Sequence, residues 1–379
     1  MTENSFLAAL CLSLAGAALL YQILLRRRGL RGAIAWITLG LGLPAGFLCA
    51  KLGFLLSEVD RLFFGSFDTL WTDAISLSLS TFSFAGACVG LALAAFAAAK
   101  IMRRSAAEVL DVFAAPFCAA IAGVRLAESF LTAFNVGDVV EAPWLRFFPV
   151  AAPNSWGEWE LTLWALCAVA ALVCLGISLL PVWQRTGKGL CFECTAYLLC
   201  ALQLLPELAR VDPIKLSQYF VRTEQVICAG VMLFLLIRGC IAVRRRGVGG
   251  FRAVALPLIL FAVCAGVHIT MQFMLDKPYK FFGGLPQETQ NWCYEHLMAL
   301  CWIPMVLATA GMILLFLMQL RRRALLPEPA LPAAPVSEPE EAARALPVPE
   351  EAVPEKEKKD KKSKKEKKSG KKGKKNKKK

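Results

Sequence analysis

Residues 33–56 read AIAWITLGLGLPAGFLCAKLGFLL, an apolar run that contains one charged side chain, Lys51. About 20 apolar residues are enough for an α-helix to cross the hydrocarbon core of a bilayer. The run therefore predicts a membrane span. An ionisable group at membrane depth is costly, so Lys51 is also a candidate functional residue.

Runs of the same kind recur along the chain, and we count nine of them. They cover residues 6–25, 33–56, 77–99, 107–123, 161–182, 190–205, 221–237, 254–275 and 297–320. The fourth and sixth are short and are interrupted by Glu108, Asp111, Glu193 and Pro206. The pattern predicts an all-α fold, a polytopic membrane bundle of about nine transmembrane helices.

The composition excludes a single soluble globular domain. Of 379 residues 57% are hydrophobic, with a mean hydropathy of +0.53, whereas soluble domains contain about 45–50% apolar residues. The chain nevertheless carries 43 Lys and Arg against 29 Asp and Glu, a net charge of +14. The location of this charge divides the chain into parts.

Most of the net charge lies at the C-terminus. Residues 355–379 hold 16 Lys and 4 acids, a net charge of +12, and residues 324–354 hold 8 of the 20 Pro, 6 acids and one Arg, a net charge of −5. The remaining +7 belongs to residues 1–323. We expect a membrane domain at 1–323, an extended Pro/Ala/Glu-rich linker at 324–354 and a disordered Lys-rich tail at 355–379.

The tail has two interpretations. Its lysines could attract an anionic lipid surface, nucleic acid or ribosomes, and any nucleic-acid binding would be sequence-blind because no aromatic residue lies among them. Alternatively, the tail only fixes the topology and has no dedicated partner.

Basic residues near span ends predict the orientation, because they are retained on the cytoplasmic side. Alternate connections contain 17 basic residues: Arg26, Arg27, Arg28, Arg31, Lys100, Arg103, Arg104, Arg185, Lys188, Arg238, Arg244, Arg245, Arg246, Arg252, Arg321, Arg322 and Arg323. The other connections contain 7: Arg61, Arg146, Arg210, Lys215, Arg222, Lys277 and Lys280. We expect the N-terminus outside and the C-terminus in the cytoplasm. The first run is expected to stay as a span, since Arg26–Arg28 follow it and no basic residue precedes it.

Cysteine and histidine give little sign of a metal or redox centre. All 14 Cys lie in the membrane domain, where they are expected to pack as small apolar residues, and the Cys191/Cys194 pair has no second pair beside it. With only His268 and His296, a His-rich metal site or Ser/His/Asp catalysis is not expected. No cofactor is expected.

Charges inside or at the ends of spans are the candidate functional residues. Besides Lys51 they form three groups, at the ends of the fourth and sixth spans and at the start of the seventh: Arg125 with Glu128, Glu207 with Arg210, and Arg222 with Glu224 and Gln225. Residues three apart share a helix face, so each of the first two groups could be a local ion pair with no function. Several cations at one membrane boundary could instead bind a phosphate-bearing ligand.

At these positions the chain resembles the prolipoprotein diacylglyceryl transferase family over about residues 10–245. AGFLCAKLGFLL at 45–56 is similar to a stretch ending Gly-Ala-Arg-Leu-Gly-Tyr, with Lys51 at the Arg. FSFAGACVG at 82–90 resembles Ser-Phe-His-Gly-Gly-x-x-Gly. AAPFCAAIAGVRLAESF at 114–130 resembles a run ending Gly-Arg-Ile-Gly-Asn-Phe, in which Arg125 matches the essential arginine.

Two further segments continue the resemblance in the same order. APNSWGE at 152–158 is similar to His-Pro-Thr-Gln-Leu-Tyr-Glu, and QLLPELAR at 203–210 to Arg-x-x-x-Glu-x-x-Arg, which keeps Glu207 and Arg210. Gln225 matches a glutamine that opens the next span. The two spans within 246–323 and the tail are additions to the family's seven-span core.

The departures fall on functional positions of the family. Ala85 and Ala152 replace its two histidines, Gln203 replaces an arginine and Glu128 replaces an asparagine. The Asn-Gly-Glu that follows that asparagine has no counterpart at 129–133. The chain is therefore similar to a divergent member.

The resemblance implies a reaction in the bacterial cytoplasmic membrane. Diacylglycerol would move from phosphatidylglycerol, or another anionic phospholipid, to the cysteine thiol of a lipobox-bearing preprolipoprotein. Arg125 would be catalytic and bind the headgroup with Arg210, Lys51, Gln203 and Gln225. With both histidines replaced, the base would be Glu207 or Glu128.

Two alternatives stay open. The chain could be a non-catalytic phospholipid-binding or scaffolding protein that kept the fold and the headgroup cations. It could also be a transporter for a small anion, since intramembrane charges also mark substrate pathways.

Overall fold

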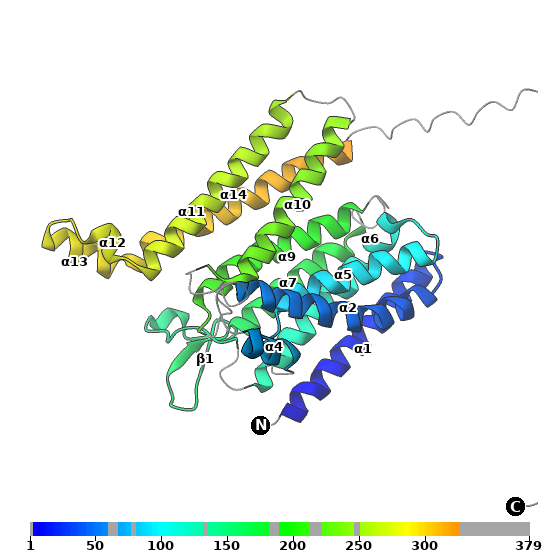
Figure 1. Ribbon diagram of the computed structural model, residues 1–379, viewed down its shortest axis with the longest axis horizontal. Helices are drawn as coiled ribbons and strands as arrows, with labels where there is room; N and C mark the ends of the chain where they lie inside the picture. Colours follow the sequence, from blue (N-terminus) through cyan, green and yellow to red (C-terminus); the bar gives the residue numbers. More distant parts are fainter. Residues whose placement is uncertain are drawn as a thin grey trace, which may run out of the picture. The chain divides into compact units, whose positions relative to one another are not determined.

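The computed structural model describes residues 3–59, 67–76, 81–131, 135–181, 189–211, 221–245 and 251–325, and these residues are predominantly helical. The long helices are α1 (Glu3–Arg27), α2 (Ala33–Ser57), α5 (Phe84–Ile101), α6 (Ala106–Ala127), α7 (Leu163–Leu179), α9 (Leu190–Ala209), α10 (Thr223–Arg245), α11 (Arg252–Asp276) and α14 (Leu297–Leu325). They pack side by side along much of their length (Figure 1). The prediction of an all-α, multi-pass membrane protein is confirmed.

Eight of these helices are long and apolar enough to cross a bilayer. The ninth, α7, is a shorter apolar helix of 17 residues that corresponds to the expected span at 161–182. The count of nine spans and the orientation of the ends stay predictions.

The third expected span starts later than the sequence predicts. Residues 77–80 of that span lie outside the described part, and α5 begins only at Phe84. The Ser83 side chain accepts a hydrogen bond from the Gly86 amide at 3.0 Å and caps this start. Apolar content alone cannot place such a start, because the capping groups set it.

The sixth span is longer than the sequence predicts. The sequence predicts an end at Leu205, before Pro206, whereas α9 continues through Pro206 to Ala209. The extension places Glu207 inside the helix and Arg210 at its C-cap.

Two glycines bring α5 against α2. A Cβ atom at Gly86 or Gly90 would overlap the backbone of Cys49 or Ala45. Glycines four residues apart allow helix backbones to approach closely within a membrane. This contact fixes the start of α5 beside Ala50, whose carbonyl accepts the Ser83 amide at 3.1 Å.

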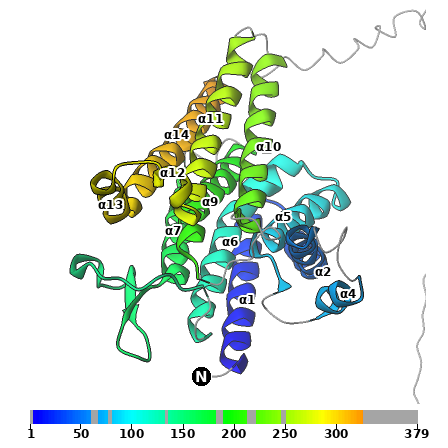
Figure 2. The same ribbon diagram turned by 60° about the vertical axis from the view of Figure 1, so that its left-hand side comes forward.

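Helices α11 and α14 form a hairpin that packs on α9 and α10 (Figure 2). The Tyr197 ring on α9 stacks on Phe316 of α14 with centroids 3.9 Å apart, and its hydroxyl donates to the Met312 carbonyl at 2.9 Å. Two short helices, α12 (Tyr279–Phe282) and α13 (Gln287–Glu295), connect α11 to α14.

A small ribbon lies between α6 and α7. Strands β1 (Ala151–Pro153) and β2 (Trp159–Leu161) pair antiparallel, and Gly137 forms an isolated bridge to Arg210. Asn154 organises the turn, since its Oδ1 accepts the amides of Trp156 and Glu158. The remaining elements are α4 (Phe67–Ile75), η2 (Glu128–Phe130) and η3 (Pro143–Leu145).

Several expectations fall outside the described residues. They are the tail at 355–379, all of the linker but its first two residues, and the basic residues Arg61, Arg185, Lys188, Lys215 and Arg246.

Candidate functional site

Arg125 lies at the end of α6 and is 1% exposed. Its Nη1 donates to both oxygens of Glu128, at 2.8 and 3.0 Å. The Asn135 amide donates to the same carboxylate at 2.6 Å. The guanidinium lies 3.6 Å from the centre of the Phe84 ring, a cation–π contact. Arg125 and Glu128 thus form a buried ion pair beside the start of α5.

Glu207 and Arg210 form the second expected pair. An Arg210 nitrogen lies 3.6 Å from Glu207 Oε1, and the Gln203 amide donates to Glu207 Oε2 at 3.4 Å. Gln225 on α10 donates to the Leu204 carbonyl at 3.2 Å, which holds the end of α9 against the start of α10. The structure therefore brings these four sequence-predicted residues together.

Glu224 is a member of the site that the sequence singled out as an intramembrane charge but did not assign to it. Its two carboxylate oxygens accept the backbone amides of Phe84 and Ala85 at 2.8 and 2.6 Å. A carboxylate is favoured at a helix N-terminus, where backbone amides lack partners. Its amide partners are 140 and 139 residues away in sequence, so no local pattern could reveal the contact.

Lys51 is placed differently from the other predicted residues. Its ammonium donates to the Ser76 carbonyl at 2.5 Å and to Thr81 Oγ1 at 2.7 Å, and it lies 4.0 Å from the centre of the Phe82 ring. These contacts tie α2 to the residues that precede α5. In the described structure Lys51 stabilises the residues that lead into α5, and it does not contact Arg125 or Glu207.

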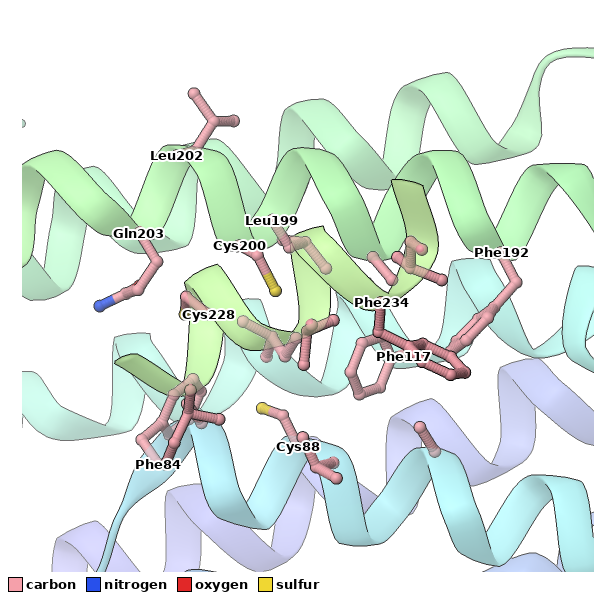
Figure 3. Close-up of a pocket in the computed structure, with 18 of the residues that line it drawn as sticks. Phe84, Cys88, Phe117, Phe192, Leu199, Cys200, Leu202, Gln203, Cys228 and Phe234 are labelled. Atoms are coloured by element: carbon pink, nitrogen blue, oxygen red, sulfur yellow. The ribbon is translucent and has the colours of Figure 1, made fainter. Parts of the chain in front are cut away.

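We refer to Arg125, Glu128, Glu207, Arg210 and Glu224 as the buried cluster. Next to it is a pocket of about 400 Å³ formed by α5, α6, α7, α9 and α10. Phe84, Ala85 and Gln203 line the end of the pocket near the buried cluster. Figure 3 shows the Gln203 amide at one end and the rings of Phe117, Phe192 and Phe234 toward the other. The volume is that of a small-molecule site, and the walls are almost wholly apolar.

Hydrogen-bonding atoms remain unused at the cluster end. Arg125 Nε, Glu207 Oε1 and Gln225 Oε1 are buried and have no hydrogen-bond partner among the described residues. A buried polar group without a partner costs about 1–3 kcal/mol. The arrangement therefore has one donor and two acceptors that a polar ligand could satisfy.

The hairpin of α11 and α14 does not line this pocket. Within the described residues no group of three or more His, Cys, Asp or Glu side chains is placed to hold a metal ion.

A helical membrane bundle with an apolar pocket and a buried charged cluster at one end is an architecture suited to an amphiphilic ligand. The model of the family described as prolipoprotein diacylglyceryl transferase matches residues 6–241, more than half of the chain. The chain therefore belongs to the prolipoprotein diacylglyceryl transferase family, a family of membrane transferases of lipoprotein biosynthesis. No match was found among curated proteins or among solved structures.

Proposed function

We propose that this protein transfers a diacylglyceryl group from phosphatidylglycerol to the thiol of a lipobox cysteine in a preprolipoprotein. The observation that carries the proposal is the set of unused polar atoms of Arg125, Glu207 and Gln225 beside the apolar pocket. Membership of the family supports a phospholipid donor and a prolipoprotein acceptor.

The donor lipid fits this arrangement in one direction. An acyl chain would occupy the pocket, which places the headgroup at the buried cluster. Arg125 Nε would donate to a phosphate oxygen, and Arg210 would add a second positive charge. The glycerol hydroxyls of the headgroup would donate to Glu207 Oε1 and Gln225 Oε1, which are the unused acceptors.

Glu207 is the proposed base. In the reaction the thiol loses its proton to Glu207, the sulfur bonds to the glyceryl carbon, and the bond from that carbon to the phosphate oxygen breaks. Glycerol phosphate leaves, and Arg125 stabilises its charge. Glu128 is less suited to the role of base, because its carboxylate already accepts bonds from Arg125 and Asn135.

We also propose the orientation that the basic residues predict. The buried cluster would face the outside, the N-terminus would be outside, and the C-terminus would lie in the cytoplasm of a bacterium. The linker at 324–354 would then carry the Lys-rich tail toward an anionic lipid surface or nucleic acid.

One observation favours a second function, that of a non-catalytic phospholipid-binding or scaffolding protein. Arg125 is already paired with Glu128, a residue that replaces the family's asparagine, and Ala85 and Ala152 replace its histidines. On this view the protein would bind the headgroup but would not activate a thiol.

The test is a transfer assay with the purified full chain, labelled phosphatidylglycerol and a lipobox peptide. We expect labelled peptide from the wild type and at least a 100-fold lower rate from Arg125→Ala, since loss of one donor to developing charge costs about 10²–10³ in rate. Lys280→Ala, an exposed change outside the site, is the matched control. If folded wild-type protein retains phosphatidylglycerol but transfers nothing, the transferase proposal fails and the binding-protein alternative stands.

A further inference from the structure

The pocket has a second end, remote from the buried cluster. Four of its lining residues are exposed, and all four lie on α5 and α10: Leu93, Phe96, Phe234 and Arg238. Phe234 is 63% exposed, and the Arg238 side chain is 48% exposed. Aromatic and aliphatic side chains that both line a pocket and face outward mark its opening. The pocket therefore opens sideways, between α5 and α10, toward the acyl chains of the bilayer.

Two cations stand at this opening, one on each helix. Lys100 lies in the last turn of α5, and its Nζ lies 5.5 Å from the centre of the Phe96 ring, which lines the pocket. Arg238 lines the pocket from α10. Both are among the 17 basic residues of the alternate connections. We call the end of the bundle that carries these residues the basic end.

The charge at this end is not balanced by the acid beside it. Glu193 on α9 is 3.1 Å from Arg238 and also pairs with Arg323 of α14. One carboxylate shared by two guanidinium groups leaves a charge of +1, and Lys100 raises it to +2. An arginine has five N–H donors, so an ion pair with Glu193 leaves donors for another acceptor.

We propose that Lys100 and Arg238 bind the phosphate of an anionic phospholipid that belongs to the leaflet at the basic end. One acyl chain of this lipid lies across the opening, against Phe96 and Phe234, outside the interior of the pocket that the donor's acyl chain would occupy. The proposal goes beyond the transferase function, because the donor headgroup occupies the opposite end of α9 and α10. It also does not require that the protein be an active transferase.

A lipid explains this site better than a free anion does. The two cations flank an apolar opening in a membrane domain, where a phosphate ester would bring its chains to the lining. Long basic side chains at a membrane boundary also keep their charged ends at headgroup level, which is the level of the phosphate.

The experiment uses the full chain in phosphatidylcholine nanodiscs that contain phosphatidylserine with a photoreactive group on one acyl chain. Phosphatidylserine is chosen because it is anionic and lacks the glycerol headgroup of the proposed donor. We expect cross-links to peptides of α5 and α10 that contain Phe96 and Phe234. Lys100→Gln, which leaves the ion pairs of Glu193 intact, should lower the cross-link yield about 5-fold, and Lys100→Gln with Arg238→Gln about 10-fold or more.

The controls separate this site from general attraction to a basic surface. Arg245→Gln removes an exposed cation of α10 that does not line the pocket and should leave the yield unchanged. Equal cross-linking of a photoreactive phosphatidylcholine, an equal loss in Arg245→Gln, or full protection by inorganic phosphate would each overturn the proposal. The outcome is independent of the transfer assay, since no lipobox peptide is present and Arg125 and Glu207 are unchanged.

Discussion

The two ends of α9 hold acidic side chains that differ in how fully they are hydrogen-bonded. At the basic end Glu193 is shared by Arg238 and Arg323, which come from α10 and α14. At the cluster end, 14 positions and about 21 Å along the helix, Glu207 Oε1 accepts no hydrogen bond and Gln225 Oε1 is likewise unused. Both carboxylates are equally buried.

This difference in hydrogen bonding distinguishes a charged residue that stabilises the fold from one that can bind a ligand. A buried carboxylate that pairs with cations from two other helices holds the three helices together, and removing it leaves buried charge uncompensated. A buried carboxylate with an unused oxygen contributes less to the fold and keeps capacity for a ligand. We therefore expect substitution of Glu207, which has an unused oxygen, to change turnover and substitution of Glu193, whose oxygens are both paired, to change stability.

The largest effect is expected for Glu207→Gln. The amide keeps the shape but cannot accept a proton, so the transfer rate should fall about 10²–10⁴-fold. The midpoint of thermal unfolding in detergent should fall less than for Glu193→Gln, because Glu207 Oε1 makes no hydrogen bond and its one ion pair, with Arg210, is long at 3.6 Å. Transfer rates and unfolding curves of the same preparation provide both measurements. A large loss of stability with unchanged transfer would reverse the roles assigned to the two ends.

Glu193→Gln should give the complementary result. The neutral amide weakens the contacts to Arg238 and Arg323, and breaking a buried ion pair costs about 3–5 kcal/mol. The unfolding midpoint should fall clearly, whereas the transfer rate per folded molecule should stay near that of the wild type. Arg322→Gln, an exposed neighbour of Arg323, is the control and should leave the unfolding midpoint where it is.

Glu224→Gln tests a residue of the buried cluster that resembles Glu193 in its contacts. Both oxygens of Glu224 accept backbone amides, so the site has no unused atom there. Hydrogen bonds to a charged group are worth about 1.5–3 kcal/mol. The amide of Gln has one acceptor oxygen and no charge, so it can accept one backbone amide and accepts it more weakly. We expect a loss of stability of about 2 kcal/mol with at most a small change in transfer rate. A selective loss of transfer would show that hydrogen-bond saturation does not distinguish the two kinds of charge.

Much of the fold could be predicted from the sequence because hydrophobic run length is a local property. The run at 33–56 corresponds to α2 at Ala33–Ser57, and the run at 297–320 to α14 at Leu297–Leu325. The start of α5 could not be placed this way. It depends on Ser83 and on Glu224, a residue 139 positions from Ala85.

The site was predictable to the extent that its pairs are local. Arg125 with Glu128 and Glu207 with Arg210 are each three residues apart, and the structure pairs both. The convergence of the two pairs depends on the packing of α6, α9 and α10, which no local spacing contains. The headgroup role of Lys51 stays a prediction, and its contacts with Ser76 and Thr81 could not be read from local spacing, because these residues are 25 and 30 positions away.

The smallest effect is expected for Tyr197→Phe. This change tests whether the contacts of the α11–α14 hairpin contribute to stability and not to transfer. The change removes the hydrogen bond to the Met312 carbonyl and keeps the ring stacked on Phe316. One such bond is worth about 1 kcal/mol, so the unfolding midpoint should fall slightly while transfer is unchanged. Tyr279→Phe, an exposed tyrosine of α12, is the control. Because α11 and α14 do not line the pocket, a fall in transfer without a fall in stability would mean that the hairpin acts on the site through α9.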